Sequence, residues 1–143
     1  MNKTHSVSKN DIQPKWHFID ARGKILGKVA SEAAAILAGK KNVTYSPHLD
    51  MMDKVVITNA SKIAVTGNKL TKKIYYRHTG FPGGIKQEIL GDLLERRPTE
   101  VLRKAVKGML PYNKLRKARI ANLYIYPGAE HPHTANLSTK KES

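Results

Sequence analysis

The sequence contains no cysteine, few aromatic residues and few acidic ones. Without cysteine, the chain has no disulfide, no thiolate-ligated metal and no thiol nucleophile, and nothing indicates an oxidising compartment. No apolar run reaches the roughly 18 residues that a membrane-spanning helix needs, and residues 1–15 lack the apolar stretch of a secretory signal. These absences predict a soluble, cytoplasmic protein with no membrane partner.

The shortage of acids leaves a large positive charge. The chain has 26 lysines and arginines against 11 aspartates and glutamates, a formal net charge of +15 at pH 7, and such a charge repels itself unless a polyanion screens it. Hydrophobic residues make up 40% of the 143 residues, enough for a packed core. We expect one domain over residues 1–143, with a flexible basic arm at 1–15, a globular core at 16–126 and an extended tail at 127–143.

Three segments in the first half predict a strand–helix–strand unit. Residues 16–19 form a short apolar run, and apolar residues then recur at helical spacing from Leu26 to Leu37, with Gly39 placed to end the helix. The continuous β-branched run Val55–Thr58 is typical of a strand covered on both faces. Two strands joined by one helix indicate a parallel crossover.

The second half begins with shorter segments and ends with clearer ones. Residues 63–65 and 74–76 favour short strands around a basic loop, and His78–Lys86 is predicted to be a loop because it is rich in glycine. A weak helix follows near 90–94. Pro98 then opens a clearer amphipathic helix that Pro111 ends. We expect a short basic helix at 114–121 and a last strand at 123–126.

The strongest functional signal is the charge density between Arg96 and Arg119. Ordinary solvated helix faces mix both signs in Glu–Lys pairs, which are scarce here. Regularly spaced cations on a helix can follow a phosphate backbone and release its counterions. We therefore predict contact with nucleic acid rather than a solvated face or a membrane-surface helix. The segment has one acid, Glu100, and nine basic residues: Arg96, Arg97, Arg103, Lys104, Lys107, Lys114, Arg116, Lys117 and Arg119.

A second basic cluster surrounds the glycine-rich loop. Glycine lets backbone amides approach phosphates closely, and neighbouring lysines supply charge. RNA or DNA contact is the favoured interpretation, and an ordinary turn is the alternative. The aromatic residues Tyr75, Tyr76 and Phe81 are more often packing residues than base-stacking ones. The cluster consists of Lys69, Lys72, Lys73, Arg77, His78, Gly80, Gly83, Gly84 and Lys86.

Three groups imitate catalytic sites, and none matches one well. The segment Gly23–Lys28 has the wrong spacing for a nucleotide-binding loop. His48, Asp50 and Asp53 offer metal ligands as in a nuclease, although such residues usually serve turns. The His-x-His pair within Glu130–His133 is too small a ligand set for zinc. We predict no catalytic residue, no metal, no cofactor and no small-molecule substrate. A metal-dependent nuclease and a DNA-associated protein remain the alternatives.

Six motifs occur together in a fixed order. They are IDARGKILGKVAS at 19–31, YSPHLD at 45–50, IAVTGNK at 63–69, YYRHTGFPGGIK at 75–86, AVKGMLP at 105–111 and EHPH at 130–133. In this combination they resemble the bacterial and organellar branch of the large-subunit ribosomal protein thirteen family, over residues 15–136. The chain departs from that pattern at Met52 and between Leu115 and Arg116, where the family has glycine.

The resemblance implies a fold and a function. The fold is a three-layer α/β/α domain with a small, mainly parallel four-stranded sheet. The function is structural: such a protein binds large-subunit ribosomal RNA early in assembly, bridges RNA helices, and lies beside neighbouring large-subunit ribosomal proteins in a cytoplasmic or organellar ribosome. At the positions that match the family's motifs, the resemblance implies these RNA contacts: Lys69, His78, Gly80, Gly83, Gly84, Lys86, Lys107, His131 and His133.

Overall fold

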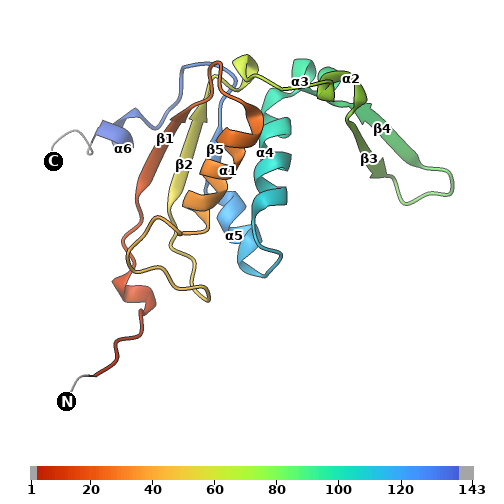
Figure 1. Cartoon of the computed structure of the whole chain (residues 1–143). Helices are drawn as coiled ribbons and strands as arrows, with labels where there is room; N and C mark the ends of the chain where they lie inside the picture. Colours follow the sequence, from red (N-terminus) through yellow and green to blue (C-terminus); the bar gives the residue numbers. More distant parts are fainter. Residues whose placement is uncertain (1–2, 139–143) are drawn as a thin grey trace.

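A parallel three-stranded sheet forms the centre of the computed structural model, which describes residues 3–138. Strands β1 (Trp16–Asp20), β2 (Lys54–Thr58) and β5 (Leu123–Ile125) lie side by side in that order (Figure 1). Helix α1 (Leu26–Leu37) connects the first two strands. The predicted strand–helix–strand unit is therefore confirmed, including its parallel pairing.

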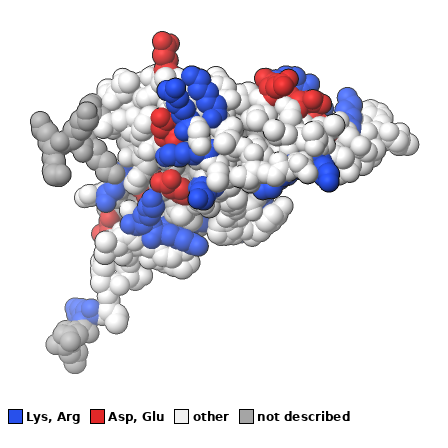
Figure 2. All heavy atoms as spheres, turned by 45° about the horizontal axis from the view of Figure 1, so that its top comes forward, with Lys and Arg blue, Asp and Glu red and all other residues white. Residues whose placement is uncertain are grey.

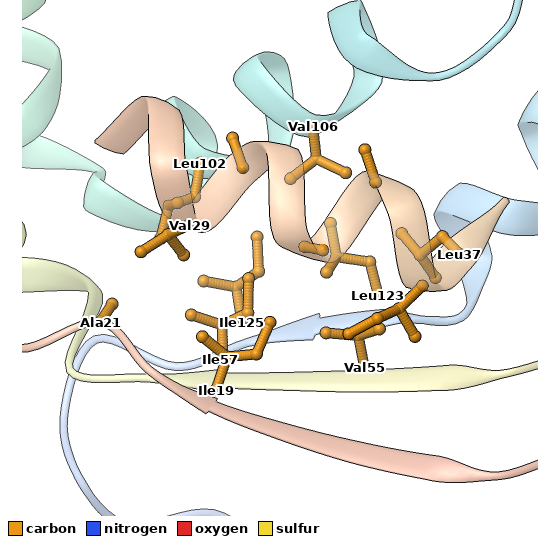
Figure 3. Packing of buried hydrophobic residues seen from close by; sticks show 14 of the residues in the cluster. Ile19, Ala21, Val29, Leu37, Val55, Ile57, Leu102, Val106, Leu123 and Ile125 are labelled. Carbon is orange, nitrogen blue, oxygen red and sulfur yellow. The ribbon is translucent and has the colours of Figure 1, made fainter. Parts of the chain in front are cut away.

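The main core lies between one face of this sheet and two helices, α1 and α4 (Pro98–Met109). Side chains on a strand alternate between faces, so the paired residues Ile19, Ile57 and Ile125 all point to the same side. Figure 3 shows them beneath α1, with Leu102 and Val106 of α4 joining from above. These side chains are at most 9% exposed, and removing such apolar area from water is the main force that holds the helices on the sheet.

An antiparallel hairpin extends away from this body (Figure 1). It consists of β3 (Ile74–His78) and β4 (Ile85–Ile89), with the single-turn helix α2 (Lys69–Lys72) before it and α3 (Leu90–Arg96) after it. A small second core joins the hairpin base to the body, because Tyr75 packs against the buried residues Leu90, Leu93 and Val101.

The predicted four-stranded sheet is not confirmed. The 63–65 segment makes a single parallel bridge, between Ala64 and Ile25. Two hydrogen bonds form it: the Leu26 N–H donates to the Ala64 carbonyl, and the Ala64 N–H donates to the Lys24 carbonyl, both at 2.9 Å. The ladder stops there because the partner segment becomes helix α1 at Leu26. The fold is α/β, with three parallel strands and a separate two-stranded hairpin.

Three further details differ from the expectations. The predicted loop at 78–86 is shorter, because His78 and Ile85 pair within the hairpin. The arm contains a 3-10 turn, η1 (Lys9–Asp11), and a second such turn, η2 (Ala60–Lys62), follows β2. The tail is not wholly extended, since α6 (Thr134–Ser138) lies against β1, and residues 139–143 of the predicted tail lie outside the described residues. The short basic helix is present as α5 (Leu115–Ala121).

Candidate nucleic-acid interface

One aromatic ring joins the two basic clusters that the sequence predicts. The ammonium groups of Lys73 and Lys104 lie 5.4 and 4.7 Å from the ring centroid of Tyr75. Lys73 precedes the hairpin and Lys104 is on α4, so residues 31 positions apart meet at one place. Cations so close to a ring face are attracted by its quadrupole. Burial raises the pKa of the Tyr75 hydroxyl above its ordinary value.

A groove with a volume of about 310 Å³ runs between the hairpin and α4. Arg77 and Lys86, which line it, are paired directly across the two strands. Like charges in that position repel and destabilise a hairpin, so a bound polyanion would relieve the repulsion. The one acid among the described lining residues, Glu88, is already paired with Arg96. The groove therefore offers the uncompensated cations Arg77, Lys86 and Lys104.

The hairpin loop holds the predicted glycines in a tight turn. A Cβ at Gly84 would overlap the Thr79 hydroxyl, and the Thr79 N–H donates to the Gly84 carbonyl at 2.9 Å. Gly80 and Gly83 have positive φ values of 88° and 69°, which side chains disfavour. The Gly80 N–H donates to Nδ1 of His78 at 2.9 Å. These glycines shape the loop, and the exposed residues His78 and Lys86 stand at its two ends.

Basic residues continue over α3, α4 and α5. Arg96, Arg97, Lys104 and Lys107 are exposed, as are Lys69, Lys72 and Lys73 before the hairpin and Lys114 and Lys117 near α5, whereas Arg103 is half-buried. Figure 2 shows lysine and arginine side chains over the body and along the hairpin, with acidic side chains fewer. Across the described residues, exposed cations thus occur on the hairpin and on α3, α4 and α5, and the acidic residues Glu88, Asp92 and Glu95 lie between Lys86 and Arg96 in the sequence.

Arg116 connects α5 to the end of α4. The resemblance leads us to expect a glycine between Leu115 and Arg116, and this chain has none there. The Nε of Arg116 donates to the Lys107 carbonyl at 3.0 Å, and its guanidinium lies 4.1 Å from the Tyr112 ring centroid. Hydrogen bonding to Arg116 lowers the pKa of Tyr112. In the same turn the Asn113 side-chain oxygen accepts the Leu115 N–H at 3.1 Å. Side chains, rather than glycine, stabilise this turn.

Arg119 lies apart from the surface. It is 2% exposed, and its Nη2 donates to the Leu49 carbonyl at 3.4 Å. Within the described residues its Nε has no hydrogen-bond partner. Because the charge is enclosed, Arg119 cannot follow a phosphate backbone in this conformation, and we place it with the residues that hold the loop after α1 on the body.

His131 and His133 lie on the face of the sheet opposite the main core. The His133 ring lies 5.1 Å from the Trp16 ring and 4.7 Å from the Tyr124 ring, and the His131 ring lies 5.7 Å from Phe18. The Nε2 atom of His133 is 2.7 Å from the Tyr126 hydroxyl. The two imidazoles therefore pack the tail onto the sheet, a contact that the EHPH motif alone does not indicate.

His48, Asp50 and Asp53, which were considered as metal ligands, all make hydrogen bonds within the fold. Asp53 is 1% exposed and accepts hydrogen bonds from the Lys15 N–H at 3.0 Å and the Asn42 amide at 2.6 Å. Burial acts most strongly to raise the pKa of Asp53, but contacts with His17, Lys15 and Asn42 together lower it below the ordinary value. In the described part of the chain, no three histidine, cysteine or acidic side chains are grouped to hold a metal ion.

The fold and this surface define a small α/β protein with a cation-lined, tyrosine-containing groove. The model of the family described as ribosomal protein L13 matches residues 14–132. A large ribosomal subunit protein uL13 of Dehalococcoides mccartyi (strain CBDB1) is 54% identical over 141 residues, which is 98% of this chain and 99% of that protein. Proteins of the same description from Symbiobacterium thermophilum and Geobacter sulfurreducens are each 50% identical over 135 residues, 94% of both chains. The chain belongs to the ribosomal protein L13 family, and the resemblance found in the motifs is confirmed.

Proposed function

We propose that this chain is a structural constituent of the large ribosomal subunit that binds large-subunit ribosomal RNA. The observation that carries the proposal is the high identity, over almost the whole length, to proteins described as part of that subunit. The net charge of +15 and the basic groove support it, because phosphate contacts provide most of the affinity for nucleic acid. The proposed location is the cytoplasm, within the ribosome.

The hairpin and α4 form the proposed RNA surface. Its groove is of a size and character that suit a backbone with partly unstacked bases, since Tyr75 and Tyr76 line it together with cations. The proposed contacts are the exposed and half-buried basic residues, the loop glycines and the two tail histidines: Lys69, Lys72, Lys73, Arg77, His78, Gly80, Gly83, Gly84, Lys86, Arg96, Arg97, Arg103, Lys104, Lys107, Lys114, Arg116, Lys117, His131 and His133.

A scaffold role follows from the shape. The hairpin extends from a body that carries its own cations on α4 and α5 (Figure 1). Two basic regions set apart in this way can contact different RNA helices and bridge them early in assembly. We propose that the chain acts as one domain without catalysis or a cofactor, and that its exposed apolar residues, such as Phe81 at 74% and Tyr112 at 92%, lie beside RNA or neighbouring ribosomal proteins.

Sedimentation tests this proposal. After gentle lysis of cells that make the full chain, a sucrose gradient should place it with the large subunit and with whole ribosomes. Stripping at high salt should release it, because salt weakens phosphate contacts. A chain that stays at the top of the gradient at low salt would overturn the proposal. In a binding assay at fixed salt, preference for duplex DNA over large-subunit RNA would favour the DNA-associated alternative instead.

A further inference from the structure

A second pocket, of about 340 Å³, lies where α1, α2 and α4 meet. Its floor is apolar: Leu26 comes from the start of α1, Leu90 from the start of α3, and Met109 from the end of α4. Two glycines open it. Gly27 on α1 and Gly108 on α4 both line the pocket, and a Cβ at either would meet nothing within 4 Å. The space that a side chain would occupy is therefore left empty on both helices.

Three ammonium groups border this apolar floor. Lys69 at the start of α2, Lys73 directly after α2, and Lys104 on α4 all line the pocket, and all three are exposed. None of the described lining residues is acidic. Lys104 also lines the basic groove, so the pocket opens beside the proposed RNA surface. Thr66 also lines the pocket and contributes a hydroxyl to it.

We propose that this pocket holds one unstacked nucleotide of the bound RNA, a proposal that rests on the proposed function. The apolar floor would receive the base, the Thr66 hydroxyl would bond to its edge, and the lysines would hold the flanking phosphates. The volume is at the lower end of the range of about 300–1,000 Å³ that is typical of small-molecule pockets. Proteins that recognise RNA often do so through bases drawn out of a stack, with cations along the backbone.

The three lysines around the pocket favour a nucleotide as its occupant over an apolar side chain from a neighbouring protein. A protein side chain entering the pocket would need only the floor and would leave three ammonium groups close together without counter-charge. A nucleotide satisfies both requirements, because the flat face of its base can lie against apolar side chains while its phosphates meet the ammonium groups. The sulfur of Met109, which is 47% exposed, is polarisable and suited to lie against such a base.

Filling the pocket tests the proposal without removing any charge. In Gly108→Leu the new side chain enters the empty space, and the helix gains a residue of better helical propensity, so the fold should be retained. We expect Gly108→Leu to weaken binding to purified large-subunit RNA about tenfold while the salt slope stays unchanged. The matched control is Gly108→Ala, which also improves the helix propensity but fills little space and should bind within twofold of wild type. Gly27→Leu should repeat the loss from the other helix.

A second measurement uses the wild-type chain. Ultraviolet crosslinking to the same RNA, with mass spectrometry of the peptides, should yield a nucleotide attached within 104–109 or 65–73. Wild-type affinity in Gly108→Leu together with no crosslink in those segments would overturn the proposal. Normal RNA affinity combined with loss of Gly108→Leu from large subunits would assign the pocket to a neighbouring protein and also overturn it. Failure of the proposed function is distinct, because wild type itself would then not bind the RNA.

Discussion

The ammonium group of Lys104 on α4 lies 4.7 Å from the centre of the Tyr75 ring on β3. This contact joins the hairpin to the body at the point where the basic groove and the pocket meet, since Lys104 lines both. Tyr75 is also part of the small core under α3. The hairpin cations are therefore fixed in position relative to the cations of α4. The hairpin and α4 together form one basic surface.

Neutralising α4 tests that surface. The double variant Lys104→Gln/Lys107→Gln should bind large-subunit RNA more weakly, and the log–log salt slope should fall by roughly one unit for each phosphate that the variant no longer neutralises. Filter binding or fluorescence anisotropy across a salt series measures both quantities. The control is Lys40→Gln/Lys41→Gln, which removes the same charge after α1, where Lys41 already lies 3.7 Å from Glu32. Equal slopes in the two double variants would show that the α4 lysines face solvent.

The sequence was sufficient to predict the elements that build the main core. Helix α4 has an aliphatic stripe between Pro98 and Pro111, and the structure places it at Pro98–Met109. Strand β2 is a β-branched run and is buried as predicted. Strand β4 could not be predicted, because its sequence IKQEI has no buried residue and owes its strand conformation to pairing with β3. Two-stranded ribbons of this kind leave a weak hydrophobic pattern.

Charge alone did not separate surface cations from buried ones. Arg119 and Lys117 look alike in the sequence, yet Arg119 is enclosed and Lys117 is exposed. The difference arises from the loop after α1, whose Leu49 carbonyl covers Arg119 and lies 70 residues away in the chain. Lys73 and Lys104 both lie over the Tyr75 ring. This arrangement likewise depends on tertiary contacts, which a local sequence pattern does not contain.

Asp53 should make the fold sensitive to acid. Its pKa is lowered in the folded state, so its contribution to stability is present above the ordinary value of about 4 and is lost as the pH falls below that through the folded-state pKa. Asp53→Asn should lower the free energy of unfolding by about 1–3 kcal/mol at pH 7, because the buried donors lose a charged acceptor, and should flatten the loss of stability in acid. Urea unfolding at pH 7 and pH 3 measures both effects.

The control for that variant is Asp50→Asn, in the same loop, whose carboxylate accepts only the Met52 N–H among the hydrogen bonds of the described residues. It should keep the acid sensitivity of wild type. An Asp53→Asn protein that loses stability between pH 7 and pH 3 as steeply as wild type would contradict this account.

Met52 carries backbone strain that glycine would remove. Its φ is 55°, in the left-handed region that favours glycine. That conformation costs a side chain about 1–2 kcal/mol, partly offset by the greater freedom of glycine in the unfolded chain. Because the Met52 side chain is 42% exposed, Met52→Gly should raise the free energy of unfolding by up to about 1 kcal/mol. Urea midpoints measure the change.

Asn59 provides the contrast, since its φ is 56° but its side-chain amide donates to Asp20 at 2.8 Å. Asn59→Gly should therefore lower stability even though it removes the same strain. A Met52→Gly protein less stable than wild type would show that the methionine side chain contributes more than the strain costs.

The tail should be held by the Tyr126–His133 hydrogen bond. Tyr126→Phe removes the hydroxyl that lies 2.7 Å from Nε2 of His133 and should lower the free energy of unfolding by about 1 kcal/mol. Trp16 is the single tryptophan and lies against His133, so its fluorescence reports directly on the contact. Tyr124→Phe is the control, because it keeps the ring that lies 4.7 Å from His133 and leaves the Tyr126 hydroxyl on Nε2 in place. Identical emission and stability in the two variants would argue against this role of the hydrogen bond.

The central claim is that the cations of the hairpin and α4 contact large-subunit ribosomal RNA. Ultraviolet crosslinking in living cells, followed by purification of the full chain and sequencing of the attached RNA, tests it most directly. The account predicts that large-subunit RNA dominates the recovered sequences and that the crosslinked peptides include ones from 73–86 and 96–107. Recovery of no RNA, or of RNA in which large-subunit sequences are not enriched over their cellular abundance, would contradict it.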